Sequence, residues 1–275
     1  MNLNSLMKKQ HFVGLFVGKN GCGKSSAALS FAEEGPVKVY DFDKRIRGGL
    51  WMRNQLTPEQ FASVEVIQPD ISKGWAEVDK ALEIDLIKKR SNSFPYKTVM
   101  FDSAATMQKY LVSDSQRLRG LANPKGGKSR GKINFWTPDD YNYCSQGFFQ
   151  FFYNYAAIID CNVIVSAWQV DKYGKPSGTP EDDDNPYAPN EVIGQKLVLT
   201  EKLSEEVPGY FDEIYVFEKE ESSLGGGSVK YTCSFESMLA KTCYTSLKKK
   251  KKLDFTNNNF YKLHSALIKD EVEGK

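Results

Sequence analysis

The chain has 275 residues, of which 40% are hydrophobic and 26% are charged, a balance typical of a globular protein with a sizeable core. Its formal net charge of +2 excludes a global polyanion-binding surface, so a nucleic-acid site would need a local cluster of basic residues. Five cysteines without C-x-x-C spacing argue against a disulfide framework or a zinc site. No apolar run approaches the roughly 18 residues of a membrane span, and the first residues contain no apolar signal core, so a cytoplasmic location is expected.

Apolar runs and helical patterns alternate along most of the chain. Strands are predicted at residues 11–17, 37–42, 64–68, 97–102 and 161–167, and helices at residues 24–34, 72–90 and 138–160. Near-continuous Val, Ile and Phe strands that are separated by helices predict an α/β fold. In this fold a mostly parallel central sheet carries helices on both faces.

The pattern changes in the last third of the chain. Residues 171–190 are rich in Pro, Gly and Asp and predict a long loop, whose acidic residues 181–184 would repel phosphate. From about residue 212, DEIYVFEK and SVKYTCSFE flank a Gly-rich turn and predict an antiparallel hairpin at one edge of the sheet. We expect a core of residues 1–245 and a Lys-rich tail of residues 246–275 that packs weakly. The run Lys248–Lys252 is expected to be solvated, and nucleic-acid binding is the alternative.

A phosphate-binding motif separates the first predicted strand from the first helix. The segment FVGKNGCGKSS, residues 16–26, fits G-x-x-x-x-G-K-[ST]. Its glycines let the backbone curl so that several N–H groups point inward, Lys24 would reach the β- and γ-phosphates, and Ser25 would hold Mg²⁺. A turn that binds nothing is the alternative, but the flanking strand and helix favour phosphate. The predicted binding residues are Gly18, Lys19, Asn20, Gly21, Cys22, Gly23, Lys24, Ser25 and Ser26.

Acidic residues follow two of the other predicted strands. Asp102 ends the run KTVMFD, where it would support the metal, although an Asp here can also cap the next helix. The run VKVYDFDKR contains Asp41 and Asp43, which point to opposite faces of a strand. Asp43 lies closer to the loop end and is predicted to orient the attacking water; a turn residue beside Lys44 or Arg45 is the alternative.

A sensor for the terminal phosphate is expected at the end of a further central strand. The run CNVIVSAWQV provides Ser166, Trp168 and Gln169 at that position. Gln169 can form a hydrogen bond with phosphate or water without carrying a charge. The alternative is that Trp168 belongs to the core or to a lid and that Gln169 is merely exposed.

The order of these parts resembles the RecA-like ATPases encoded by phages, often described as phage nucleotide-binding or AAA-family ATPases, some of which act as single-strand annealing recombinases. The resemblance covers about residues 10–245 and implies a P-loop NTPase of RecA-like type. It implies ATP and Mg²⁺ at the phosphate loop, metal support at Asp102, and catalytic roles for Lys24 and Asp43. RecA-type proteins usually have Glu at the position of Asp43. Many relatives carry His at the position of Trp168, which shifts the expected sensor to Gln169.

A basic segment follows the strand that ends in Asp102. Residues 117–132 read RLRGLANPKGGKSRGK, contain no acidic residue, and predict a mobile loop that tracks the backbone of single-stranded DNA. A solvated surface loop is the alternative. Phe135 and Trp136 follow it and are expected to pack in the core. The predicted nucleic-acid-binding residues are Arg117, Arg119, Lys125, Lys128, Arg130 and Lys132.

The leading hypothesis is an ATPase that acts on single-stranded DNA in recombination, annealing or repair. The resemblance implies a homo-oligomer, as a ring or a filament, in the host cytoplasm and without membrane contact. A phage single-strand-binding or replication protein is a possible partner. Two alternatives stay open: a DNA-stimulated motor or helicase or packaging accessory, and a nucleotide-gated binding protein with little hydrolysis. The replacement of Glu by Asp43 favours the last of these.

Overall fold

The computed structural model describes residues 11, 13–46, 55–122, 136–174, 191–221, 229–235 and 252–272. The strands are β1 (Val13–Gly18), β2 (Val37–Asp41), β3 (Val64–Ile67), β4 (Thr98–Asp102), β5 (Asn162–Gly174), β6 (Glu191–Leu197), β7 (Glu213–Glu221), β8 (Val229–Ser234) and β9 (Lys252–Asp254). The α-helices are α2 (Lys24–Leu29), α3 (Pro58–Ala62), α4 (Trp75–Arg90), α5 (Ala104–Ala122), α6 (Pro138–Phe151), α7 (Glu201–Glu206) and α8 (Phe260–Val272).

The described strands form one nine-stranded sheet. Its order is β3-β2-β4-β5-β1-β7-β8-β9, and β6 pairs with the outer part of β5. All neighbours from β3 to β7 are parallel, whereas the pairs β7–β8, β8–β9 and β5–β6 are antiparallel. The predicted mostly parallel sheet with an added antiparallel hairpin is therefore confirmed.

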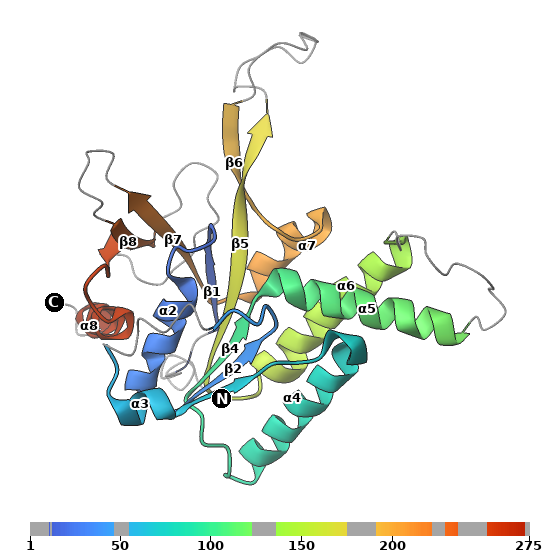
Figure 1. The fold of residues 1–275 in the computed structure, drawn as a ribbon, viewed down its shortest axis with the longest axis horizontal. Helices are drawn as coiled ribbons and strands as arrows, with labels where there is room; N and C mark the ends of the chain where they lie inside the picture. Colours follow the sequence, from blue (N-terminus) through green and yellow to red (C-terminus); the bar gives the residue numbers. More distant parts are fainter. Residues whose placement is uncertain are drawn as a thin grey trace.

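Helices cover both faces of the sheet (Figure 1). Helices α2 and α8 lie on one face, and α4, α5 and α6 lie on the other. Each face has its own core: Phe16 packs with Phe217 and Phe260 on the first, and Tyr40 stacks on Phe101 on the second, with ring centroids 4.9 Å apart. Strands buried on both faces need apolar residues at successive positions, which explains the continuous apolar runs of the sequence.

Helix α5 is the main element that the sequence did not predict. Its buried face mixes apolar residues such as Met107 and Leu111 with the polar residues Gln108, Asp114 and Ser115, which hides the helical period. The strand predicted at 161–167 is also longer than expected. Residues 171–174 of the predicted loop belong to β5, because they pair with β6; the rest of that loop, residues 175–190, lies outside the described residues.

The expectation of a weakly packed tail is wrong for residues 252–272. Strand β9 pairs with β8, and α8 buries Phe260 and His264 against the core. The hydroxyl of Tyr215 forms a hydrogen bond of 2.8 Å with Nε2 of His264. Burial lowers the pKa of His264 to about 4, so this imidazole is neutral near pH 7. Within the described residues, no helix combines the length and apolar character needed to cross a bilayer.

A buried charge cluster joins β2 to α4 and to the short π-helix Phe152–Ala156 that precedes β5. Asp85 is fully buried and lies 2.5 Å from the ammonium of Lys38, measured from Oδ1 to Nζ. Its other oxygen, Oδ2, accepts hydrogen bonds from the hydroxyls of Tyr40 at 2.8 Å and Tyr155 at 3.3 Å. These donors compensate the cost of burying the carboxylate charge. Removal of the carboxylate would leave all three partner groups buried without a hydrogen-bond acceptor.

We predict that Asp85→Ala lowers the free energy of unfolding by about 3–5 kcal/mol, because it leaves Lys38 as an uncompensated buried charge. The matched control is Glu83→Ala, at an exposed position on the same helix, which should change stability by less than about 0.5 kcal/mol. Chemical denaturation followed by circular dichroism measures both values. Equal changes in the free energy of unfolding in the two variants would show that the buried charge cluster makes no specific contribution to stability.

Candidate phosphate-binding site

The phosphate motif forms a curled loop between β1 and α2. Gly18 ends β1, and a Cβ atom at this position would lie 2.3 Å from the carbonyl oxygen of Phe217 and 2.7 Å from Sγ of Cys22. Gly23 precedes α2 with φ of 93°, in the left-handed region that favours glycine. The motif glycines therefore permit close backbone contact with β7 and the sharp entry into α2.

Lys24 lies across this loop with its ammonium group inside the curl. Its Nζ atom donates hydrogen bonds to the carbonyl oxygens of Gly18 at 3.0 Å and Lys19 at 2.8 Å, and it lies 3.5 Å from Sγ of Cys22. Burial raises the pKa of the Cys22 thiol, an effect that the neighbouring Lys24 opposes. The positive charge of Lys24 is thus held at the centre of the loop, where a phosphate group needs it.

Ser25 and Asp102 meet at the mouth of the loop. The Ser25 hydroxyl donates a hydrogen bond of 2.7 Å to Oδ2 of Asp102, and the Ser166 hydroxyl donates to Oδ1. Burial raises the pKa of Asp102, while the hydrogen bonds from Ser166 and Ser25 act in the opposite direction. A hydroxyl and a carboxylate are oxygen ligands of the kind that Mg²⁺ prefers, so these two residues fit the predicted metal.

The two acidic residues of the VKVYDFDKR run have different surroundings. Asp41 is buried, and it accepts hydrogen bonds from the backbone N–H groups of Arg45 and Ile46 and from the side chain of Gln68. It therefore shapes the turn after β2. Asp43 accepts hydrogen bonds from the hydroxyls of Ser103 and Thr106 and lines the same pocket as Asp102.

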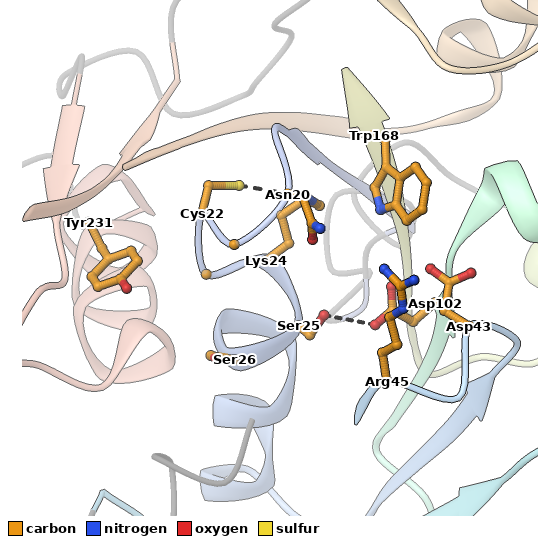
Figure 2. Close-up of a pocket in the computed structure, with 12 residues that line it drawn as sticks. Asn20, Cys22, Lys24, Ser25, Ser26, Asp43, Arg45, Asp102, Trp168 and Tyr231 are labelled. Atoms are coloured by element: carbon orange, nitrogen blue, oxygen red, sulfur yellow. Dashed lines mark hydrogen bonds between the residues drawn. The ribbon is translucent and has the colours of Figure 1, made fainter. Parts of the chain in front are cut away.

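A pocket of about 230 Å³ surrounds the loop (Figure 2). Figure 2 shows Arg45, Asp43, Asp102 and Trp168 on one side of the loop and Tyr231 on the other. Arg45 and Tyr231 were not predicted to take part: Arg45 looked like a turn neighbour, and nothing near Tyr231 in the sequence marks it. The lining residues are Asn20, Gly21, Cys22, Gly23, Lys24, Ser25, Ser26, Asp43, Arg45, Asp102, Trp168 and Tyr231.

The predicted sensor Gln169 does not line this pocket. It is buried and lines a neighbouring pocket with Lys19 and Asn20 of the loop. Trp168 lines both the pocket around the loop and this neighbouring pocket, whereas Gln169 lines the neighbouring one. Ser166, on the same face as Trp168, contacts Asp102 instead. A sensor role for Gln169 stays a prediction.

The predicted DNA loop begins as a helix. Arg117 and Arg119 lie on α5, where Arg117 pairs with Asp114 at 2.7 Å and Arg119 pairs with Asp140 at 2.6 Å. The expectation of a mobile loop is therefore wrong for residues 117–122. The sequence could not show this, because both carboxylates lie outside the basic segment. The remaining predicted DNA-binding residues, Lys125, Lys128, Arg130 and Lys132, fall outside the described residues.

Two further predictions concern the aromatic residues after the basic segment and the lysine run near the carboxyl terminus. Trp136 packs against the core, as expected, with its ring centroid 5.8 Å from that of Tyr141. Phe135 lies outside the described residues. Of the run Lys248–Lys252 the structure describes Lys252, which pairs with Glu220 at 2.7 Å and with Glu218 at 3.4 Å.

Comparison with known families agrees with this geometry. A family model described as an AAA domain matches residues 11–244, a range that contains the phosphate loop, Asp43, Asp102 and all strands from β1 to β8. The chain belongs to this AAA domain family. It is accordingly an AAA-type P-loop ATPase, and the nucleotide-binding part of the expected resemblance is confirmed. No curated protein matches the chain. The phage origin and the strand-annealing type stay predictions.

We predict that Gly18→Ala lowers stability by about 1–3 kcal/mol, because the new methyl group would overlap a backbone oxygen of β7 that cannot rotate away. The displaced loop should also bind ATP more weakly. Gly209→Ala is the matched control, because a Cβ atom at Gly209 meets nothing within 4 Å. Thermal unfolding and isothermal titration with magnesium–ATP measure both effects. Normal ATP binding by the Gly18 variant would contradict the close contact of loop and strand.

Proposed function

We propose that this AAA domain is a Mg²⁺-dependent ATPase that acts on single-stranded DNA in recombination, annealing or repair. The observation that carries the ATPase part is the contact between Ser25 and Asp102 at the mouth of a loop that surrounds the Lys24 ammonium. A triphosphate and its metal need a cation inside the loop and paired oxygen ligands at its mouth.

The charged and hydroxyl groups of the pocket have separate roles in this reaction. Backbone N–H groups of the loop and Lys24 bind the phosphates and stabilise the charge that develops on them. Ser25 and Asp102 would hold a Mg²⁺ ion, which would neutralise further phosphate charge. Asp43, from the turn after β2, orients the attacking water as a general base. Arg45 lines the same end of the pocket and adds a second positive charge there.

Helix α5 supports the DNA part of the proposal. Its first turn lies in the site, where Thr106 donates a hydrogen bond to Asp43. Its last turns carry Arg117 and Arg119 and lead directly into the basic residues 125–132. Helix α5 therefore runs from the turn that contacts Asp43 to Arg117 and Arg119, so a nucleotide-dependent movement of its first turn would be transmitted to these two basic residues.

A second candidate is a nucleotide-gated binding protein that hydrolyses little ATP. The observation that favours it is the bonding of Asp43, both of whose carboxylate oxygens accept hydrogen bonds, one from Ser103 and one from Thr106. These two hydrogen bonds leave fewer carboxylate lone pairs available to a water molecule. The side chain of Asp is also shorter than that of Glu, so it reaches less far toward the phosphate.

We predict that the protein binds and hydrolyses magnesium–ATP and that Lys24→Ala lowers turnover by roughly 10²-fold or more, since it removes the cation that stabilises the transition state. Asp102→Asn should reduce the dependence of ATP binding on Mg²⁺ while the fold stays intact. A coupled phosphate-release assay and titration calorimetry, with and without EDTA, give the values. The control is Lys73→Ala, on an exposed residue remote from the pocket lining.

The outcome also separates the two candidates. Wild-type protein that binds ATP but shows background turnover with every DNA tested supports the nucleotide-gated binding protein. Wild-type protein that neither binds nor hydrolyses ATP would defeat both candidates.

We predict that single-stranded DNA stimulates the ATPase and that neutralising Lys125, Lys128, Arg130 and Lys132 together abolishes the stimulation. The slope of log affinity against log salt should fall by about 0.7 for each charge that contacts a phosphate. Lys88→Gln is the control, at an exposed lysine of α4 outside the basic segment, and it should change DNA affinity little. Fluorescence anisotropy at several salt concentrations measures the slope. Unchanged DNA binding by the fourfold variant would refute the role of the segment.

A further inference from the structure

The pocket around the phosphate loop has two chemically different ends. The carboxylates of Asp43 and Asp102 lie at one end, together with Arg45 and the hydroxyl of Ser25. Figure 2 shows Tyr231 at the other end, across the loop, with Ser26 on its side of α2. A triphosphate bound with its metal at Ser25 and Asp102 therefore extends along the loop toward the aromatic end.

Tyr231 is held in place by the segment that follows β9. Its backbone N–H donates a hydrogen bond of 2.9 Å to Oγ1 of Thr256, and its carbonyl oxygen accepts one of 3.1 Å from the N–H of Phe255. The rings of Tyr231 and Phe255 lie with their centroids 6.1 Å apart. Tyr231 is partly exposed and lines the pocket.

This aromatic wall is continuous with the phosphate loop. A Cβ atom at Gly23 would lie 3.1 Å from the ring of Phe255 and 3.5 Å from Cδ1 of Tyr231. Phe255 is itself buried and packs edge-on against Phe217 and Phe260, and these contacts fix the position of its ring. The wall also depends on residues beyond the AAA match, which ends at residue 244.

We propose that Tyr231 is the stacking platform for the nucleobase, and that the carboxyl-terminal segment 252–272 builds this subsite by holding Tyr231 from behind. The inference rests on the proposed function, because the position of the metal fixes which end of the pocket receives the nucleoside. An aromatic ring binds any base through its π-face, so the platform adds affinity for a nucleoside triphosphate without selecting one base. Trp168 lies at the acidic end and does not serve this role.

The test compares magnesium–ATP with magnesium–tripolyphosphate, which has the phosphates but no base. We expect Tyr231→Leu to weaken ATP binding by about tenfold, the usual order for loss of one base-stacking contact. Tripolyphosphate binding should stay within twofold of wild type. Tyr231→Phe, which keeps the ring, should bind ATP within twofold of wild type. Titration calorimetry gives the affinities, and circular dichroism checks the fold of each variant. Tyr153→Leu, on an exposed aromatic residue of the opposite helical layer, is the matched control.

Four results would overturn the inference. The first is a Tyr231→Leu variant that binds ATP with wild-type affinity. The second is a Tyr231→Leu variant that loses ATP and tripolyphosphate binding equally, which would show that the ring only supports the loop. A third is loss of ATP binding in Tyr231→Phe, which would assign the effect to the hydroxyl group. The fourth is a Trp168→Leu variant that shows the selective loss in place of Tyr231→Leu. Absence of ATP binding by the wild type is a separate result, which defeats the proposed function itself.

Discussion

The hydrogen bond from Ser25 to Asp102 is the interaction on which the site depends. It joins the first turn of α2 to the end of β4, two segments 77 positions apart in the chain. The bond is possible because β1, β2, β4 and β5 are parallel neighbours, so their carboxyl ends meet at one edge of the sheet. Everything else in the pocket is arranged around that edge.

The surroundings of Asp102 balance two opposing effects. Burial favours the neutral acid, whereas the hydroxyls of Ser25 and Ser166 favour the carboxylate that a metal requires. The nearby carboxylate of Asp43 favours the neutral acid as well. A divalent cation relieves both the burial cost and the repulsion, so the acidic end of the pocket is suited to bind metal together with phosphate.

The carboxyl-terminal segment belongs to the architecture of the AAA domain although the family match ends before it. Strand β9 extends the sheet beyond β8, and α8 completes the core that α2 also covers. Through Phe255, this segment contacts the back of the phosphate loop at Gly23. The chain thus uses residues outside the shared domain to shape one side of the nucleotide pocket, while α5 on the other face leads away toward the basic segment.

The sequence by itself determined the features that are local. Residues 18–25 form a phosphate loop through their own glycines and lysine, and the apolar run before Asp102 places that carboxylate at a strand end. Tertiary structure alone decided that Tyr231 faces the loop, that Arg119 pairs with Asp140, and that residues 252–272 complete the core. Their partners lie far away in the chain or on other elements, and such contacts arise from sheet order and helix packing, which no short pattern of residues encodes.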